Sequence, residues 1–425
     1  MTRKMKDSGV EWIGEIPDGW KVSRFKDIAN LYTGNSISSD DKSKYIIDKD
    51  NTYPYVATKD ILLGSNTIDY SNVLYTPSEN EKFKIAAADS VLMCVEGGSA
   101  GKKKAYLTKT VNFVNKLCCF TPTNIKGKYL FYILSSKGFE EEFNKYLSGL
   151  ISGVSIGILK SVYMAYPRDQ FQQQKIVDIL DDKVGKIDKI ISETQQSIEE
   201  LKKYKQSLIV EWTSGKFTKG EMFHNDRIDY IESIPKNWSI VKLGKISQKL
   251  NRTTDVNEPV LVCSSSGKVL YKDKTNTGLL PENFDKYQGV KQGDLLIHGM
   301  DTWHGAIAVS ELDGLVTPVV HVCESSQNKK FLSYYLQGLA IRKVYKAISN
   351  GVRGNTSDFR SWDKVAEISI MLPPISEQKI IVSFLDKKIY NIENLISDKE
   401  QIISSYEQYK KSLIYEYVTG KKEVE

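Results

Sequence analysis

The stretch Gly97–Lys102 comes nearest to a phosphate-binding loop. It reads Gly-Gly-Ser-Ala-Gly-Lys, and glycine amides followed by a lysine can cradle a nucleotide phosphate. The nucleotide-binding motif also needs a glycine separated from the Gly-Lys pair by four residues, and a Ser or Thr after that pair. Glu96 and Lys103 occupy those two places. The stretch is therefore expected to be a tight glycine turn between two strands.

Histidines and serines form no catalytic or metal-binding pattern either. His224, His298, His304 and His321 make no His-Glu-x-x-His motif and no zinc cluster with cysteines. His298 and His304, in one short loop, come closest to a pair of ligands. The sequence has no Gly-x-Ser-x-Gly elbow, no Asn-Pro-Pro-aromatic motif and no glycine-rich loop for a methyl-donor cofactor. We therefore expect no catalytic residue, no metal site and no cofactor in this chain.

Four loops rich in glycine, hydroxyl and basic residues indicate binding instead. Lys and Arg neutralise phosphates, and Arg, Asn, Ser and Thr read base edges. The alternative for any one of these residues is a solvated charge or a local salt bridge. The candidate nucleic-acid-binding residues are Gly98, Ser99, Lys102, Lys103, Lys104, Ser152, Ser155, Thr302, Trp303, His304, Arg353, Asn355 and Arg360.

Short β-rich runs and one helix surround the loops in each half of the chain. In the first half we expect strands over 53–57, 90–95, 110–114 and 162–167, and a helix over 128–147. In the second half we expect strands over 259–262, 294–297, 315–320 and 368–373, and a helix over 329–348. Each half therefore predicts a mixed α/β globule.

A long helix follows each globule, and the two helices are near-copies. Residues 173–216 and 378–421 are identical at 19 of 44 positions without a gap. Their apolar residues alternate at spacings of four and three, which is typical of a coiled-coil seam. Thr194, Lys205, Lys399 and Lys410 interrupt that seam. Pairing of the two helices with each other is the simplest way to cover both seams, and separate packing onto each globule is the alternative.

An Ile-Pro-x-x-Trp turn opens each half, at Ile16–Trp20 and Ile234–Trp238. The chain thus repeats the order globule, helix, globule, helix. The expected domains are 1–167, a central helix at 168–220, 221–373, and a C-terminal helix at 374–425.

This pattern resembles the specificity subunit of a type I restriction–modification system. Both helices carry Gln-x-x-Ile-Val-x-x-Leu-Asp, at 173–181 and 378–386, and Tyr-Lys-x-Ser-Leu-Ile, at 204–209 and 409–414. The resemblance covers essentially all 425 residues and rests on the helices, because the globule sequences differ between such proteins.

The resemblance implies a mixed α/β fold. Two target recognition domains are separated by two long antiparallel helices that form a coiled coil, with an internal pseudo-twofold repeat. Each domain would read half of a split site in double-stranded DNA. Two DNA adenine methyltransferase subunits would dock on the frame, and restriction motor-nuclease subunits would join them. The methyl donor, ATP and Mg are then expected in those partners, and this chain would be no enzyme.

Composition sets the remaining expectations. A net charge of +6 excludes a strongly basic DNA coat but permits a local basic surface. Five cysteines without a paired motif suit a reducing compartment. No signal peptide and no apolar run of 18 residues is visible, so we expect a cytoplasmic protein without a membrane span. The rival interpretation is a non-catalytic coiled-coil scaffold with two protein-binding modules.

Overall fold

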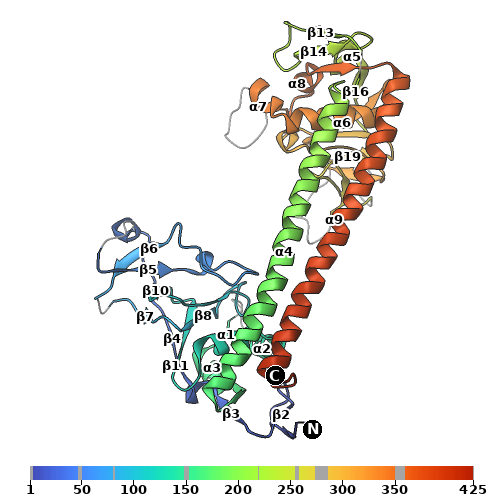
Figure 1. Ribbon diagram of the computed structural model, residues 1–425. Helices are drawn as coiled ribbons and strands as arrows, with labels where there is room; N and C mark the ends of the chain where they lie inside the picture. Colours follow the sequence, from blue (N-terminus) through green and yellow to red (C-terminus); the bar gives the residue numbers. More distant parts are fainter. Residues whose placement is uncertain are drawn as a thin grey trace. The chain divides into compact units, whose positions relative to one another are not determined.

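The computed structural model of the chain describes residues 3–45, 50–79, 82–147, 153–218, 220–253, 258–272, 286–349 and 359–424 (Figure 1). The fold forms two compact units. Unit 1 contains residues 1–195 and 400–425, and unit 2 contains residues 196–399. Each unit is described by itself below.

Two long helices contribute to both units. Helix α4 spans Gln170–Thr213 and helix α9 spans Ile375–Val418, so their bounds differ by 205 residues at each end. They begin three residues before the predicted positions, because Asp169 caps the first turn of α4 and Pro374 accepts the first amides of α9. Gly215 and Gly420 follow the helices with φ of 71° and 70°, the left-handed conformation that ends a helix.

The globule of unit 1 is built around a four-stranded antiparallel sheet in the order β4-β11-β8-β9 and a second sheet in the order β6-β5-β10-β7. Separate two-stranded pairs are β12 with β3 and β1 with β2. The elements are β1 (Met5–Asp7), β2 (Glu15–Pro17), β3 (Trp20–Arg24), η1 (Phe25–Asp27), β4 (Ala29–Thr33), η2 (Lys42–Tyr45), β5 (Thr52–Val56), η3 (Thr58–Asp60), β6 (Leu74–Pro77), β7 (Ile85–Ala86), β8 (Val91–Cys94), β9 (Lys104–Tyr106), β10 (Val111–Phe113), β11 (Leu117–Pro122), α1 (Gly127–Ser135), α2 (Lys137–Lys145), α3 (Ile156–Ser161) and β12 (Tyr163–Pro167).

The globule of unit 2 repeats this topology with a different sequence. Its main sheet has the order β16-β23-β20-β21, and β15 pairs with β24 as β3 pairs with β12. The counterpart of the second sheet consists of two pairs, β17 with β18 and β19 with β22. The elements are β13 (Met222–His224), β14 (Ser233–Pro235), β15 (Ser239–Lys242), α5 (Leu243–Ile246), β16 (Ser247–Lys249), β17 (Leu261–Cys263), β18 (Val269–Tyr271), β19 (Gln288–Val290), β20 (Leu295–His298), η4 (Thr302–His304), β21 (Ile307–Val309), β22 (Gly314–Val316), β23 (Val320–Ser325), α6 (Lys329–Ile341), α7 (Val344–Ile348), α8 (Trp362–Ala366) and β24 (Ser369–Leu372).

Three predicted elements are interrupted. The helix expected over 128–147 is two helices, because the Ser136 side chain caps α2 by accepting from the Phe139 amide at 3.3 Å. The helix expected over 329–348 breaks at Lys343, whose φ is 61°. The prediction of one strand over 315–320 is wrong, since β22 ends at Val316 and the next strand, β23, begins at Val320.

A buried glutamine joins each globule to its long helix. In unit 1, Gln173 is fully buried; its Nε2 donates to the carbonyl of Pro167 at 2.9 Å, and its Oε1 accepts from the amide of Lys126 at 2.9 Å. The residue thereby ties the end of β12 and the start of α1 to α4. In unit 2, Gln378 makes the same two bonds, at 2.9 and 3.0 Å. The first residue of the repeated helix motif is thus a structural joint in both units.

A carboxylate forms a second joint further along each helix. Asp181 accepts a bond from Lys128 Nζ at 2.7 Å and one from the Tyr132 hydroxyl at 2.5 Å. In unit 2, Asp386 accepts from Lys330 Nζ and the Tyr334 hydroxyl at 3.0 and 2.6 Å. Both globules therefore hold their helix with a lysine and a tyrosine four residues apart on α1 or α6.

Two of the polar residues on the seam form ion pairs across it. In unit 1, Lys410 of α9 pairs with Asp188 of α4 at 2.6 Å. In unit 2, Lys205 of α4 pairs with Glu393 of α9 at 2.9 Å. The first half of α4 thus meets the last part of α9, and the last part of α4 meets the first half of α9. Apolar seam residues surround both pairs and belong to the two main cores.

The Ile-Pro-x-x-Trp turns pack against the glycines that end the long helices. A Cβ built on Gly420 would lie 2.6 Å from Pro17 Cδ, and one on Gly215 would lie 2.5 Å from Pro235 Cγ. Only glycine allows so close an approach. Each turn therefore packs against the end of a long helix, and the turn at the start of the chain packs against the end of α9.

Candidate nucleic-acid interface

The glycine stretch of unit 1 is a tight turn between β8 and β9, as expected. The Ala100 amide donates to the Gly97 carbonyl at 2.9 Å, and the Lys102 amide donates to the Ser99 carbonyl at 3.0 Å. These amides are used inside the turn and are not free to cradle a nucleotide phosphate. Gly98 is exposed and Ser99 is half-buried, so the tip of the turn is open to a partner.

The three lysines after this turn differ in accessibility. Lys102 is exposed, whereas Lys103 is half-buried and donates from Nζ to the Thr58 carbonyl at 3.0 Å. Lys104 lies in β9, is 5% exposed and donates to the Leu134 carbonyl at 2.6 Å. Burial lowers the pKa of Lys104 to about 8. The buried amine cannot reach a phosphate, so the prediction of a three-lysine basic turn is corrected to Lys102, with Lys103 at its edge.

The serine-rich loop of unit 1 contributes little to a site in the described residues. Ser155 is exposed, but its hydroxyl caps α3 by accepting from the Ile158 amide at 3.3 Å. That bond gives the side chain a structural role. Ser152 lies outside the described residues.

The three candidate residues in the loop after β20 of unit 2 differ in their exposure. Thr302 is fully buried, so it belongs to the core and not to an interface. Trp303 is half-buried and His304 is exposed, and both line one hollow of the surface. His298, at the start of this loop, accepts from the Asp301 amide at 3.1 Å. Burial lowers the pKa of His298, and the Asp301 carboxylate opposes that shift.

Arg360 is exposed at the end of the second candidate loop, and its neighbour Phe359 anchors it. The buried His321 donates from Nε2 to the Phe359 carbonyl at 2.8 Å. A Cβ on Gly299 would lie 2.5 Å from that same carbonyl oxygen, so glycine is needed there. Burial lowers the pKa of His321. The base of this loop is thus firmly held. Arg353 and Asn355 lie outside the described residues.

The hollow beside Trp303 and His304 is basic. Its volume is about 620 Å³, and it lies between η4, the junction of α6 and α7, and the long helix α4. Four lysines line it, and none of its described lining residues is acidic: Lys202, Lys205, Lys343 and Lys346. We call these lysines with Trp303 and His304 the basic hollow. Lys346 Nζ lies 5.5 Å from the centre of the Trp303 ring.

Sequence reasoning did not select these four lysines. They come from α4 and from the junction of α6 and α7, and only the fold brings them to the loop at 302–304. One signal in the sequence could have singled out Lys202. In the matched helices its counterpart, 205 residues later, is Glu407. The charge at this position is therefore reversed between the two copies, as it also is between Asp182 and Lys387.

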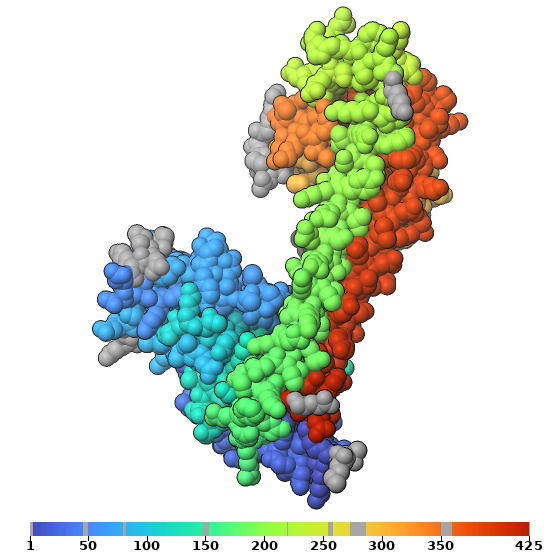
Figure 2. All heavy atoms as spheres, in the orientation of Figure 1, coloured from blue at the N-terminus to red at the C-terminus, as the bar shows by residue number. Residues whose placement is uncertain are grey.

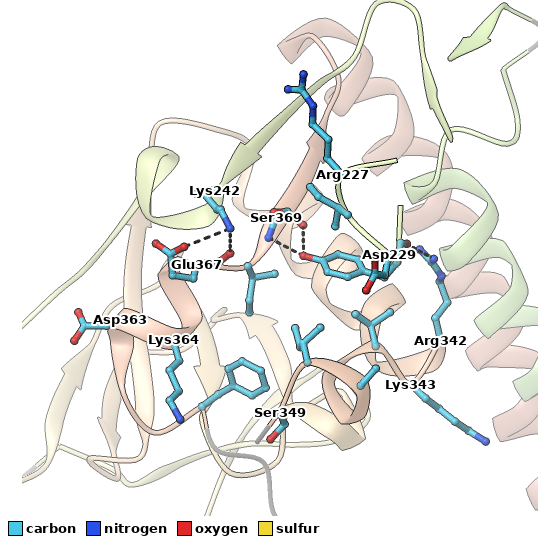
Figure 3. Close-up of a pocket in the computed structure, with 17 residues that line it drawn as sticks. Arg227, Asp229, Lys242, Arg342, Lys343, Ser349, Asp363, Lys364, Glu367 and Ser369 are labelled. Atoms are coloured by element: carbon cyan, nitrogen blue, oxygen red, sulfur yellow. Dashed lines mark hydrogen bonds and ion pairs between the residues drawn. The ribbon is translucent and has the colours of Figure 1, made fainter. Parts of the chain in front are cut away.

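A larger hollow of unit 2, of about 900 Å³, has mixed charge (Figure 3). Lys242 Nζ bonds the Glu367 carbonyl at 2.9 Å and lies 3.3 Å from its carboxylate. Arg342 donates to the Tyr230 carbonyl, and the Tyr230 hydroxyl accepts from the Ser369 amide at 2.9 Å. Its carboxylates and bonded cations make this hollow a weaker candidate for an anion than the basic hollow.

Metal sites and membrane spans are both missing from the described part of the chain. No group of three or more His, Cys, Asp or Glu side chains there is arranged to hold a metal ion, and His298 and His304 are not joined by further ligands. No helix there combines the length and hydropathy needed to cross a membrane. All five cysteines are buried and unpaired.

Comparisons with known proteins point in one direction. The family described as type I restriction modification DNA specificity domain matches residues 17–203 and 235–403. The type I restriction enzyme MjaVIII specificity subunit of Methanocaldococcus jannaschii is 24% identical over 96% of this chain and 93% of its own length. The putative MjaX specificity subunit of the same organism is also 24% identical, over 96% of this chain and 95% of its length.

A solved chain from work on complex assembly and conformational transition of the type I R-M system has a similar fold. Its TM-score is 0.67 at 13% identity, over 95% of this chain and 98% of that one. At that identity the likeness concerns the fold alone. The family match covers most of both halves, including both recognition globules and most of both long helices. This chain therefore belongs to the type I restriction–modification DNA specificity family, as a specificity subunit.

Proposed function

We propose that this specificity subunit reads a bipartite target in double-stranded DNA. Residues 1–167 and 221–373 would be the two target recognition domains, each reading one half-site. The helices at 168–220 and 374–425 would form an antiparallel coiled coil that sets the spacer between the half-sites. The observation that carries this proposal is the repeated joint, in which Gln173 and Gln378 fix two different globules to matched helices with the same bonds.

The exposed candidates would divide the work of binding. Lys102 on the turn of unit 1 and the lysines of unit 2 would neutralise phosphates, which supplies affinity without sequence information. Arg360 and His304 are exposed on loops with buried anchors. Such side chains can reach base edges with little loss of entropy, because their backbone is already fixed.

The long helices would also receive the methyltransferase subunits. Tyr204 and Tyr409 are 51% and 53% exposed at matching positions, and Ile190 and Leu395 form a second matching pair at 36% and 49%. All four occupy one heptad position beside the seam, on the flank opposite Asp181 and Asp386. Large parts of both helices are open at the surface (Figure 2). Ile190 and Tyr409 belong to unit 1, and Tyr204 and Leu395 belong to unit 2. Each unit therefore exposes an equivalent pair of apolar side chains, which would suit two copies of one methyltransferase subunit.

Catalysis would then belong to the partners. The methyl donor, ATP and Mg would bind to the methyltransferase and the motor-nuclease subunits, and this chain would supply only recognition. This division agrees with its lack of a catalytic sequence motif.

Genome-wide mapping of methylated adenine tests the proposal. Cells would express the methyltransferase partner with this chain or without it. The expected result is a split motif with two short defined halves and a fixed gap, present only with this chain. No new methylation, with the same partner active beside another specificity chain, would contradict the proposal and favour the scaffold interpretation.

A further inference from the structure

The basic hollow of unit 2 gathers four lysines, of which two have a carboxylate partner in the described structure and two do not. Lys205 pairs with Glu393, and Lys202 has an exposed partner in Glu199 at 2.7 Å. Lys343 and Lys346 have no carboxylate of the described residues within ion-pair distance. Like charges that converge on a concave surface repel one another unless an anion occupies it.

The backbone of Lys343 adds a second, independent observation. Its φ of 61° and ψ of 21° place a lysine in the left-handed conformation. A side chain with a Cβ enters this region only at a cost, and glycine would adopt it without strain. This strained residue is the N-cap of α7 and lines the hollow. The fold thus holds a charged side chain where a turn alone would favour glycine.

The other residues that line the basic hollow are suited to the phosphate and sugar groups of a nucleic-acid backbone. Ser265 and Ser266 supply hydroxyl groups from the turn between β17 and β18, and Gln337 supplies an amide. Trp303 offers an apolar ring beside the amine of Lys346. Phosphate oxygens take bonds from Lys and Ser, and a deoxyribose packs against an aromatic ring.

We propose that the basic hollow seats phosphates of the DNA backbone, next to the loops that read the second half-site. This inference rests on the proposed function and assigns the anchoring interaction to named residues. Because Glu407 stands where a repeat of Lys202 would be, unit 1 has no matching anchor at that position.

The test is the salt dependence of DNA binding by the complex with its methyltransferase subunits. Fluorescence anisotropy would measure affinity for a labelled duplex with the cognate site and for a scrambled duplex, between about 50 and 200 mM salt. Lys202→Ala has a matched control in Lys203→Ala, since both are exposed on α4 and Lys203 does not line the hollow. A double variant combines Lys343→Gly, which keeps the left-handed backbone, with Lys346→Ala.

The slope of log affinity against log salt should fall by about 0.9 for each phosphate that the protein no longer neutralises. Lys202→Ala and the double variant should show this reduction on both duplexes, whereas Lys203→Ala and Lys346→Arg should not. Unchanged slopes in both hollow variants, with specific binding intact in the wild type, would overturn the inference. A reduction on the cognate duplex alone would overturn it too, since that result means base reading. A wild-type complex without sequence-specific binding would contradict the proposed function instead.

Discussion

Replacement of Gln173 by alanine should loosen the first recognition globule from its helix. The side chain is fully buried, and both of its bonds go to main-chain groups, the Lys126 amide and the Pro167 carbonyl, at 2.9 Å each. Alanine leaves both groups without a partner, and each orphaned buried group costs about 1–3 kcal/mol. We expect Gln173→Ala to lower the free energy of unfolding by about 2–6 kcal/mol.

The neighbouring glutamine provides a matched control. Gln174 is half-buried and bonds to Asp178, four residues along the same helix, at 2.7 Å. A pair of this kind on a helix surface contributes about 0.2–0.5 kcal/mol. Gln174→Ala should therefore be close to neutral.

Urea unfolding followed by circular dichroism would compare the two variants with the wild type, and hydrogen exchange would report the protection of the first turn of α1. Gln173→Ala should lose protection at α1 and keep it in α6, which belongs to unit 2. In cells, it should weaken methylation of the bipartite site, because the first half-site would be held less firmly. Equal free energies of unfolding for the two variants, within about 0.5 kcal/mol, would refute the role of Gln173 in holding the globule to the helix.

Three further predictions concern charged groups. Asp188→Lys and Lys410→Asp should each lower the free energy of unfolding by about 1–3 kcal/mol, because Lys410 is only 12% exposed. The double variant, in which the two charges are exchanged, should restore part of the lost stability. A double variant as unstable as the sum of the single variants would contradict the pairing. Lys104 has a folded pKa of about 8 against 10.5 in the unfolded chain, so between these values only the unfolded chain keeps the proton and the wild type gains stability as pH rises. Lys104→Met should therefore be more stable than the wild type by about 1–3 kcal/mol at pH 7, and this difference should shrink toward pH 10.5. Thermal unfolding of both proteins across this pH range would measure the difference. A difference that does not change with pH would exclude a neutral buried amine. Lys102→Ala should reduce the salt slope of DNA binding by about 0.9, whereas Lys104→Met should leave that slope unchanged, and equal slopes for both variants would remove Lys102 from the interface.

The sequence predicts the long helices to within three residues, because heptad spacing and the terminal glycines are local signals. It also places most strands, since β-rich runs are local as well. The predicted helix over 128–147 runs through the break at Ser136, although a serine before a helical turn is a capping signal. The prediction for Lys104 is wrong for another reason. A lysine that follows two lysines is expected to be exposed, but its burial in β9 depends on the packing of α1.

The candidate site was harder to predict than the fold. Trp303 and His304 were selected because they share a loop, but Lys202 precedes that loop by about 100 residues and Lys346 follows it on another helix. Their convergence is a property of tertiary packing and leaves no pattern in either segment alone. In the sequence the repeated Gln and Asp of the helix motif indicate a family, whereas their physical role as joints depends on their partners in the fold.

The division of unit 1 between the two ends of the sequence has a consequence for folding during synthesis. The Tyr129 hydroxyl donates to the carbonyl of Val418, 289 residues later, and the Tyr415 hydroxyl donates to the carbonyl of Trp12. At about 5–20 residues per second, roughly 15–60 s separate the synthesis of Tyr129 from that of Val418. During that interval the apolar face of α4 around Ile187 lacks the cover that α9 provides. Unit 2 is contiguous, so the unit that is begun first is the one completed last.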